Sequence, residues 1–156
     1  MATRDFSKKQ EKVISDFLFE GGGLTPNSGA GFKKADLQTS RFIVEAKTHT
    51  TKTNKHSVLI ADVSKLWKYA EGALKVPLYI FDFGSQKLAD QWVLMPLTNA
   101  RVFTAAIDDV EKIPLDVDST KKSFLVHKPS GYKLFFFNLN GVACVIFPLN
   151  MWKGVY

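Results

Sequence analysis

Two acidic residues and one lysine in a short stretch of the sequence have the spacing and the chemistry of a phosphodiester-cleaving site. Asp36 precedes Glu45 by nine residues, and Lys47 follows Glu45 by two. Side chains two positions apart on a β-strand leave the same face, so Glu45 and Lys47 are expected side by side. Asp36 is expected to begin one strand and Glu45 to lie in the next, and a hairpin would bring the two carboxylates together.

This arrangement predicts a metal-dependent site. Two carboxylates that lie close together repel each other unless a cation lies between them. Oxygen ligands with positions left open for water suit Mg²⁺ or Mn²⁺. Such an ion lowers the pKa of a bound water and polarises a phosphodiester, and Lys47 can neutralise the charge that develops during attack on phosphorus. We therefore expect catalysis by Asp36, Glu45 and Lys47, with Mg²⁺ or Mn²⁺ as the cofactor.

The elements that must position these residues indicate a mixed α/β fold, with a central mixed sheet flanked by helices. Apolar residues at helical spacing predict helices over residues 7–20 and 62–74, the second capped by Asp62. Residues 48–56 are polar and predict a loop. Runs of β-branched and aromatic residues predict strands at 35–39, 42–47, 78–83 and 91–95.

The last third of the chain predicts a β-hairpin or meander added to this core. Three apolar runs, over residues 123–127, 132–138 and 142–148, predict strands, and Asn140-Gly141 between the last two is a strong hairpin signal. Residues 101–122 carry five acidic side chains and predict a solvated connection. We expect a single domain with a core over about 6–100 and a β extension over about 101–156. Whether the added strands extend the central sheet or form a separate layer is left open.

Composition favours a polyanionic partner. The 156 residues carry a net charge of +6, and residues 1–56 contribute +4 of it, from ten Lys and Arg against six Asp and Glu. The single cysteine, Cys144, excludes an internal disulfide and a cysteine-based zinc site. No apolar run approaches the length of a membrane span, and the first residues lack the apolar stretch of a signal peptide. These features favour a nucleic-acid partner and predict an intracellular protein, of the cytoplasm, without membrane contact.

The motif resembles the PD-(D/E)XK nuclease superfamily, in which an acidic residue in one strand precedes Glu-x-Lys in the next. The larger pattern is similar to the archaeal-type and phage Holliday junction resolvases. It comprises Phe6–Glu11, Ser28–Asp36 and Phe42–Thr48, and it covers roughly residues 6–95. Ala35 departs from this pattern, in which glycine usually precedes the aspartate. The resemblance implies a restriction-endonuclease-like fold and a DNA-binding nuclease of DNA recombination and repair, which would act in the host's cytoplasm if a phage encodes it.

Further site residues follow from this resemblance. Glu11 matches the acidic residue of the N-terminal helix and would join Asp36 and Glu45 as a metal ligand and catalytic residue. The helical wheel independently places Glu11 beside the buried arc of its helix. Ser28 could equally be an ordinary turn serine, and Thr48 and Lys52 could equally be solvated loop residues. The position of Lys33 and Lys34 beside the site favours a DNA contact over a solvated loop. The residues expected to contact DNA are Ser28, Lys33, Lys34, Thr48 and Lys52.

Function is thus predicted as paired incision of four-way DNA junctions by a homodimer, because a two-fold dimer presents two sites in matching register. The apolar segment from Leu134 to Trp152 is either an interface or part of the core. The alternatives are a nuclease of the same superfamily with another DNA target, of restriction or repair type, a DNA-binding module without catalysis, and a basic structural protein. Asp82, at the end of a buried strand, is interpreted as a cap rather than a fourth acid, and no metal role is expected for His56 or His127.

Overall fold

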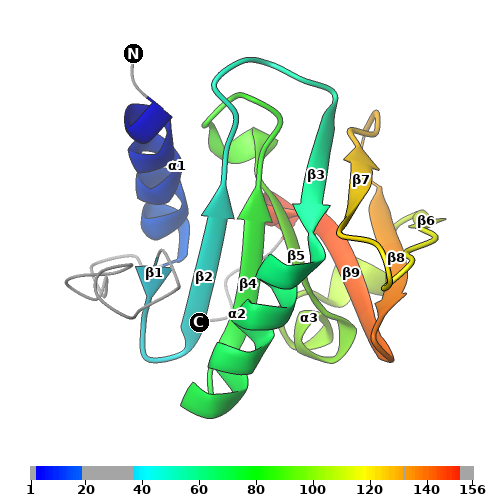
Figure 1. Ribbon diagram of the computed structural model, residues 1–156. Coiled ribbons are helices and arrows are strands. Elements are labelled where there is room, and N and C mark those ends of the chain that lie inside the picture. The colour runs from blue at the N-terminus through cyan, green and yellow to red at the C-terminus, as the bar shows by residue number, and fades with distance from the viewer. Residues whose placement is uncertain (1–2, 19–36, 132, 152–156) are drawn as a thin grey trace.

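A seven-stranded mixed sheet forms the centre of the structure, which is a computed structural model describing residues 3–131, except 19–36, and 133–151. Figure 1 shows the helices on its two faces. The helices are α1 (Thr3–Leu18), α2 (Ile60–Ala73) and α3 (Leu97–Phe103). The strands are β1 (Leu37–Gln38), β2 (Phe42–Lys47), β3 (Lys55–Leu59), β4 (Val76–Phe81), β5 (Trp92–Pro96), β6 (Lys112–Pro114), β7 (Ser123–His127), β8 (Leu134–Leu139) and β9 (Val142–Pro148).

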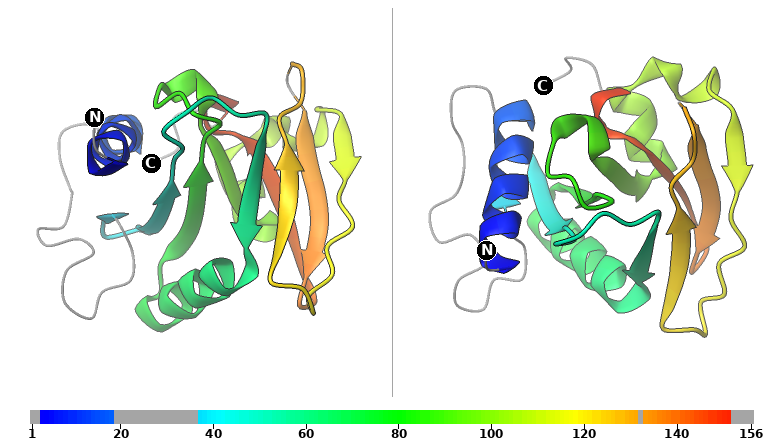
Figure 2. Two further views of the ribbon diagram at one scale, coloured as in Figure 1. Left: turned by 45° about the horizontal axis from the view of Figure 1, so that its top comes forward. Right: turned by 90° about the horizontal axis from the view of Figure 1, so that it is seen from above.

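The strand order of the sheet is β1-β2-β4-β5-β9-β8-β6. β2 runs parallel to β4, with Glu45 opposite Tyr79, and β6 runs parallel to β8, whereas the other neighbours are antiparallel. The parallel pair β2 and β4 is connected through β3 and α2, which cover one face of the sheet (Figure 2). This mixed sheet with flanking helices confirms the predicted α/β class.

β8 and β9 answer the question that the sequence left open, because they lie within the central sheet between β5 and β6. Their hairpin turns at Asn140 and Gly141 with φ of 51° and 83°, the positive values that a tight two-residue turn requires. Residues 144–147 are all buried, as expected for a strand covered on both faces. β7 instead pairs with β3 in a separate two-stranded sheet.

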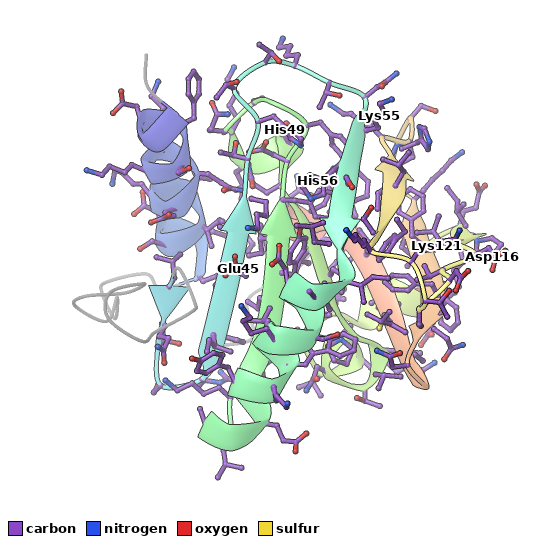
Figure 3. All side chains as sticks on the ribbon, in the orientation of Figure 1. Glu45, His49, Lys55, His56, Asp116 and Lys121 are labelled. Atoms are coloured by element: carbon purple, nitrogen blue, oxygen red, sulfur yellow. The ribbon has the colours of Figure 1, made fainter. Side chains whose placement is uncertain are left out.

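Three predictions about the connecting segments are wrong. The loop expected over 48–56 already becomes β3 at Lys55, which Figure 3 labels together with His56. Residues 101–122 are not a solvated connection throughout, because α3 ends there and Ile107 is buried in the core. The expected cap Asp62 lies inside the first turn of α2, and the capping position is Leu59. Strands over 42–47, 123–127 and 142–148 have the predicted bounds.

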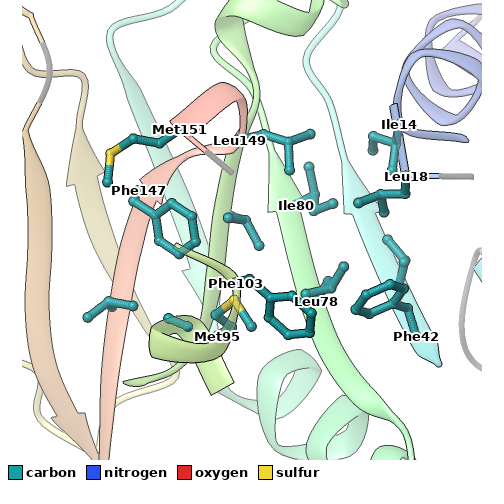
Figure 4. Close-up of a cluster of buried hydrophobic side chains, with 14 of the residues drawn as sticks. Ile14, Leu18, Phe42, Leu78, Ile80, Met95, Phe103, Phe147, Leu149 and Met151 are labelled. Carbon is teal, nitrogen blue, oxygen red and sulfur yellow. The ribbon is translucent and has the colours of Figure 1, made fainter. Parts of the chain in front are cut away.

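Two apolar clusters fill the two faces of the sheet. On one face, α1 and α3 pack through Ile14, Leu18 and Phe103 against Phe42 and Leu78 (Figure 4). On the other face, α2 and the β3–β7 pair pack against the alternate side chains of the same strands. Cys144 belongs to this second cluster, and burial raises the pKa of its thiol to about 12. Within the described segments, no helix is long and apolar enough to cross a membrane.

Candidate functional site

The β1–β2 hairpin forms the scaffold of the candidate site. Leu37 lies opposite Val44, and the Thr39 hydroxyl accepts hydrogen bonds from the backbone N–H groups of Arg41 (3.2 Å) and Phe42 (3.0 Å), which fix the turn. Asp36 directly precedes Leu37 in the sequence and lies outside the described residues. Its pairing with Glu45 therefore stays a prediction. Three expected DNA contacts also lie outside the described residues: Ser28, Lys33 and Lys34.

Glu45 and Lys47 point to the same face of β2, as the strand period predicted. Lys47 Nζ lies 3.2 Å from Glu45 Oε2 and 3.5 Å from Asp62 Oδ2. β2 supplies the first two residues and the first turn of α2 supplies Asp62, so the packing of α2 on the sheet brings the second carboxylate to the lysine. One ammonium thus holds two carboxylates in a half-buried setting (Figure 3, where Glu45 is labelled).

Asp62 is the acidic residue that the sequence analysis interpreted differently. Its Oδ2 atom is buried and, among the described residues, receives no hydrogen bond; the contact with Lys47 is an ion pair without hydrogen-bond geometry. A signal was present in the sequence, because Asp62 stands one helical turn before the buried Leu66 and so borders the face that α2 turns to the sheet. A buried carboxylate oxygen without a donor gains free energy from a nearby cation.

Behind the charged residues lies a layer of rings. Tyr79 faces Glu45 across the β2–β4 pair, and its hydroxyl forms a hydrogen bond of 3.0 Å with His56 Nε2. Burial raises the pKa of Tyr79 well above its usual value, and the charges of Asp62 and Glu45 raise it further. The phenol therefore stays protonated beside the two carboxylates, as a neutral floor of the site.

His56 continues this hydrogen-bonded chain toward the surface. Its Nδ1 lies 2.9 Å from His49 Nε2, and its ring stacks on Phe81 with the centroids 4.4 Å apart. Burial lowers the pKa of His56 to about 3, with further lowering by His49 and Lys47. The neutral ring donates through one nitrogen and accepts through the other. The alternating burial of β3 places His56 inside, a pattern that the sequence analysis missed by assigning this stretch to a loop.

A second polar network fixes the end of β2. The buried Asp82 carboxylate accepts hydrogen bonds from the Thr48 hydroxyl (2.7 Å), from the Gly84 N–H (3.0 Å) and from the Gln91 amide (3.1 Å). Burial raises the pKa of Asp82, and these donors lower it in part. Asp82 thus caps the turn after β4, as expected. The Thr48 hydroxyl is engaged here and also accepts from Gln86 Nε2 at 3.0 Å.

Glu11 lies half-buried on α1, next to a contact with the site strand. The neighbouring Gln10 donates its amide to the carbonyl of Lys47 at 2.6 Å, so α1 is attached to the end of β2. The buried residues of α1 pack on the face of the sheet opposite to the Glu45 and Lys47 side chains. The role of Glu11 as a metal ligand stays a prediction.

A metal ion held by the described residues alone would have at most two His, Cys, Asp or Glu ligands. In the part of the chain that the structure describes, no three His, Cys, Asp or Glu side chains converge on a common position. Glu45 and Asp62 are one pair of carboxylates joined by a cation, and Asp36 lies beyond the described start of β1. The chemistry of this donor set is that of a hard divalent cation, since it offers carboxylate oxygens and no thiolate.

Comparison with known proteins adds no family assignment. No model of a known protein family matches the chain, and a search of curated proteins finds no similar sequence.

Proposed function

We propose that the chain is a divalent-metal-dependent DNA endonuclease that acts on four-way junctions. The observation that carries this proposal is the position of Lys47, whose ammonium lies between the carboxylates of Glu45 and Asp62 at the end of a parallel strand pair. Enzymes that hydrolyse phosphodiesters use carboxylates to hold a metal ion and a neighbouring ammonium to stabilise the charge on phosphate. The spacing of Asp36, Glu45 and Lys47 and its resemblance to the PD-(D/E)XK superfamily support the same conclusion.

The residues present fit a divalent cation. The buried Asp62 Oδ2 receives no hydrogen bond from the described residues, and the Glu45 carboxylate lies on the same ammonium. Asp36 and Glu45 would hold Mg²⁺ or Mn²⁺, with Glu11 as the further ligand that the resemblance implies and Asp62 as the further carboxylate on this face. When bound, the ion lowers the pKa of water and polarises the phosphodiester.

The chain's own residues bind and orient the substrate. Lys47 holds a non-bridging phosphate oxygen and neutralises the charge that grows on it during attack. Asp62 and Glu45 fix the position of the ammonium, and the protonated Tyr79 keeps the floor of the site free of a third negative charge. The network from Asp82 to Thr48 holds the backbone after Lys47 in place.

Junction selectivity and a homodimer remain part of the proposal through the resemblance. A two-fold dimer would present two sites to the two symmetry-related strands of a junction. The apolar C-terminal segment no longer supports an interface, because most apolar side chains of β8 and β9, together with Leu149, are buried within the chain itself. Light scattering at micromolar concentration measures the mass directly, and a monomer would remove the paired-incision mechanism.

The experiment that tests the function is incubation with Mg²⁺ of linear duplex, single-stranded and four-way-junction DNA. Symmetric nicks in the junction, faster than cutting of the duplex, are the expected result. Equal cutting of all three would replace the resolvase with a nuclease of the same superfamily that has another target. Binding without cutting in Mg²⁺ and in Mn²⁺ would replace the enzyme with a DNA-binding module.

A further inference from the structure

A basic hollow of about 280 Å³ opens beyond the ends of β2 and β4. Three lysines from three separate segments surround it, and its floor is the buried ring of Phe83. Two hydroxyl side chains complete the polar wall, Thr53 and Ser85. The lysines are Lys52, Lys87 and Lys128.

Backbone contacts join these segments into one frame. The N–H of Thr53 donates to the Phe83 carbonyl at 2.9 Å, and the N–H of Lys128 donates to the Asn54 carbonyl at 2.8 Å. Gly84, at φ +104°, lies so close to the loop that an added Cβ would stand 2.4 Å from the Thr51 carbonyl oxygen. The backbone of these segments therefore fixes the positions of the side chains that line the hollow.

The one acidic residue in the lining belongs to this frame. Asp90 Oδ2 accepts from the N–H groups of Phe83 and Ser85 at 3.0 Å each, and Oδ1 pairs with Lys128 Nζ at 3.2 Å. Lys128 also lies over the Phe83 ring, 5.7 Å from its centroid. Asp90 thus neutralises one of the three lysines, and the lining keeps an excess of positive charge.

Lys52 and Lys87 supply that excess. Both are exposed, and neither forms an ion pair with another described residue. The two ammonium groups therefore have no anionic partner among the described residues. The Ser85 hydroxyl accepts from the Lys87 N–H at 3.3 Å, and the Thr53 hydroxyl already donates to the Lys55 carbonyl at 3.3 Å, so the ammonium groups are the main donors left for a ligand. The chemical group that satisfies such a set is a phosphate, which accepts from several donors at once.

A second hollow of about 320 Å³ adjoins the first and shares Ala89 and Lys128 with it. Its other lining residues are largely apolar and include Trp92, Pro129 and Pro148. A nucleoside next to a bound phosphate would reach such a surface with its base and sugar. A base in a duplex is already stacked, so this second hollow suits an unpaired nucleotide.

We infer that the two hollows bind one nucleotide of an unpaired DNA strand, with its phosphate at Lys52, Lys87 and Lys128 and its base against Trp92 and Pro129. This inference rests on the proposed function in taking DNA as the carrier of the phosphate. Lys52 follows Lys47 by five residues in the chain, and the Asp82 network ties the two hollow-forming loops to the end of β2. A strand held there would be guided toward the Glu45 face.

The test measures binding of a fluorescent oligothymidylate of roughly twelve nucleotides, a length within the usual footprint of single-strand sites. Anisotropy is recorded in chelator at several NaCl concentrations, with Lys52→Ala and Lys87→Ala. Lys121→Ala is the matched control, because Lys121 is an exposed lysine at a distant turn. Each hollow variant should lower the log–log salt slope by about 0.7, which corresponds to about fivefold weaker binding at about 0.1 M salt.

Unchanged binding by the hollow variants, or an equal loss with Lys121→Ala, would overturn the inference. A fully abasic oligonucleotide of the same length should bind more weakly than oligothymidylate. Equal binding would refute the part of the inference that places a base in the second hollow. Thymidine monophosphate and inorganic phosphate serve as competitors at the same molar concentration as the oligonucleotide. Tighter binding of either competitor than of the strand would assign the hollow to a free phosphate compound and overturn the strand proposal.

A cleavage assay of the wild type, run beside the binding assay of the lysine variants, separates this inference from the proposed function. If binding depends on Lys52 and Lys87 but the wild type does not cut DNA, the strand-binding inference is supported and the nuclease proposal is refuted. If the wild type cuts DNA but Lys52→Ala and Lys87→Ala bind the strand as the wild type does, the strand-binding inference is refuted and the nuclease proposal is retained.

Discussion

Two regions near the end of β2 handle charge in opposite ways. On the Glu45 face, the lysine lies within 3.5 Å of both carboxylates, in a half-buried setting over Tyr79. In the basic hollow, Lys52 and Lys87 extend into solvent. Interactions between partly buried charges resist screening by salt, whereas exposed charges are screened within a Debye length. In the proposed function, this difference lets the first region act on a bound phosphodiester and the second attract and hold a DNA strand.

Metal removal should separate the two regions most strongly. We expect full loss of cleavage in excess chelator, cleavage in Mg²⁺ or Mn²⁺, and binding without cutting in Ca²⁺, because the larger ion relaxes the ligand geometry. Binding of oligothymidylate by the hollow should persist in chelator. Gel assays of cleavage and anisotropy of binding measure both on the same preparation. Full activity in chelator would contradict metal dependence.

Removal of the central ammonium should cost nearly as much. Lys47→Ala should lower the cleavage rate by about 10²-fold or more, since one charge aimed at the developing phosphate charge is worth that much in other active sites. Asp36→Asn should have a similar effect, and Glu11→Gln a smaller one. DNA binding and the circular dichroism spectrum should remain close to wild type. A cleavage rate for Lys47→Ala equal to that of Lys121→Ala would refute the assignment.

The sequence predicted the charged pair on β2 because a strand period of two allows no other placement for Glu45 and Lys47. It also predicted the α/β class and the hairpin at Asn140-Gly141. It did not decide the role of Asp62. A short acidic residue at a helix start is compatible with a cap as well as with a place on the buried face, and the packing of α2 against β2 decides between them.

The basic hollow was equally invisible in the sequence. Lys52, Lys87 and Lys128 come from three distant segments, and the sequence suggested a DNA contact for Lys52 alone. Their meeting depends on long-range pairing, with Lys128 following β7 and Asn54 preceding β3. Local patterns carry no information about such contacts.

Gly84→Ala should damage the hollow, and Gly72→Ala is its matched control. The first change places a Cβ against the backbone of Thr51 and Lys52 at a positive φ, so a loss of about 2 kcal/mol or more in the free energy of unfolding is expected. Nothing lies within 4 Å of a Cβ at Gly72, which is in α2, so a gain of about 0.5 to 1 kcal/mol is expected there. Urea unfolding measures both. Equal effects would show that the close approach at Gly84 is unimportant.

His56 should make the fold sensitive to mild acid. Its pKa of about 3 in the folded chain lies below the value of 6.5 in the unfolded chain, so the unfolded chain binds more protons between these values. Stability is therefore full above about pH 6.5 and falls as the pH decreases, by about 2 kcal/mol at pH 5. Urea unfolding at pH 7.5 and pH 5 measures this difference. His56→Phe should flatten the dependence, and an unchanged dependence in that variant would assign it to other groups.

The most direct test of the claim that Glu45 belongs to an active site compares it with a second glutamate that lies elsewhere on the protein. Glu45 lies on the ammonium of Lys47, and Glu71 is exposed near the end of α2. Single-turnover cleavage of a four-way junction in Mg²⁺ is measured for the wild type, Glu45→Gln and Glu71→Gln. The account predicts equal rates for the wild type and Glu71→Gln, and a loss of about 10²-fold or more for Glu45→Gln. Equal rates in all three, or no cleavage by the wild type, would contradict it.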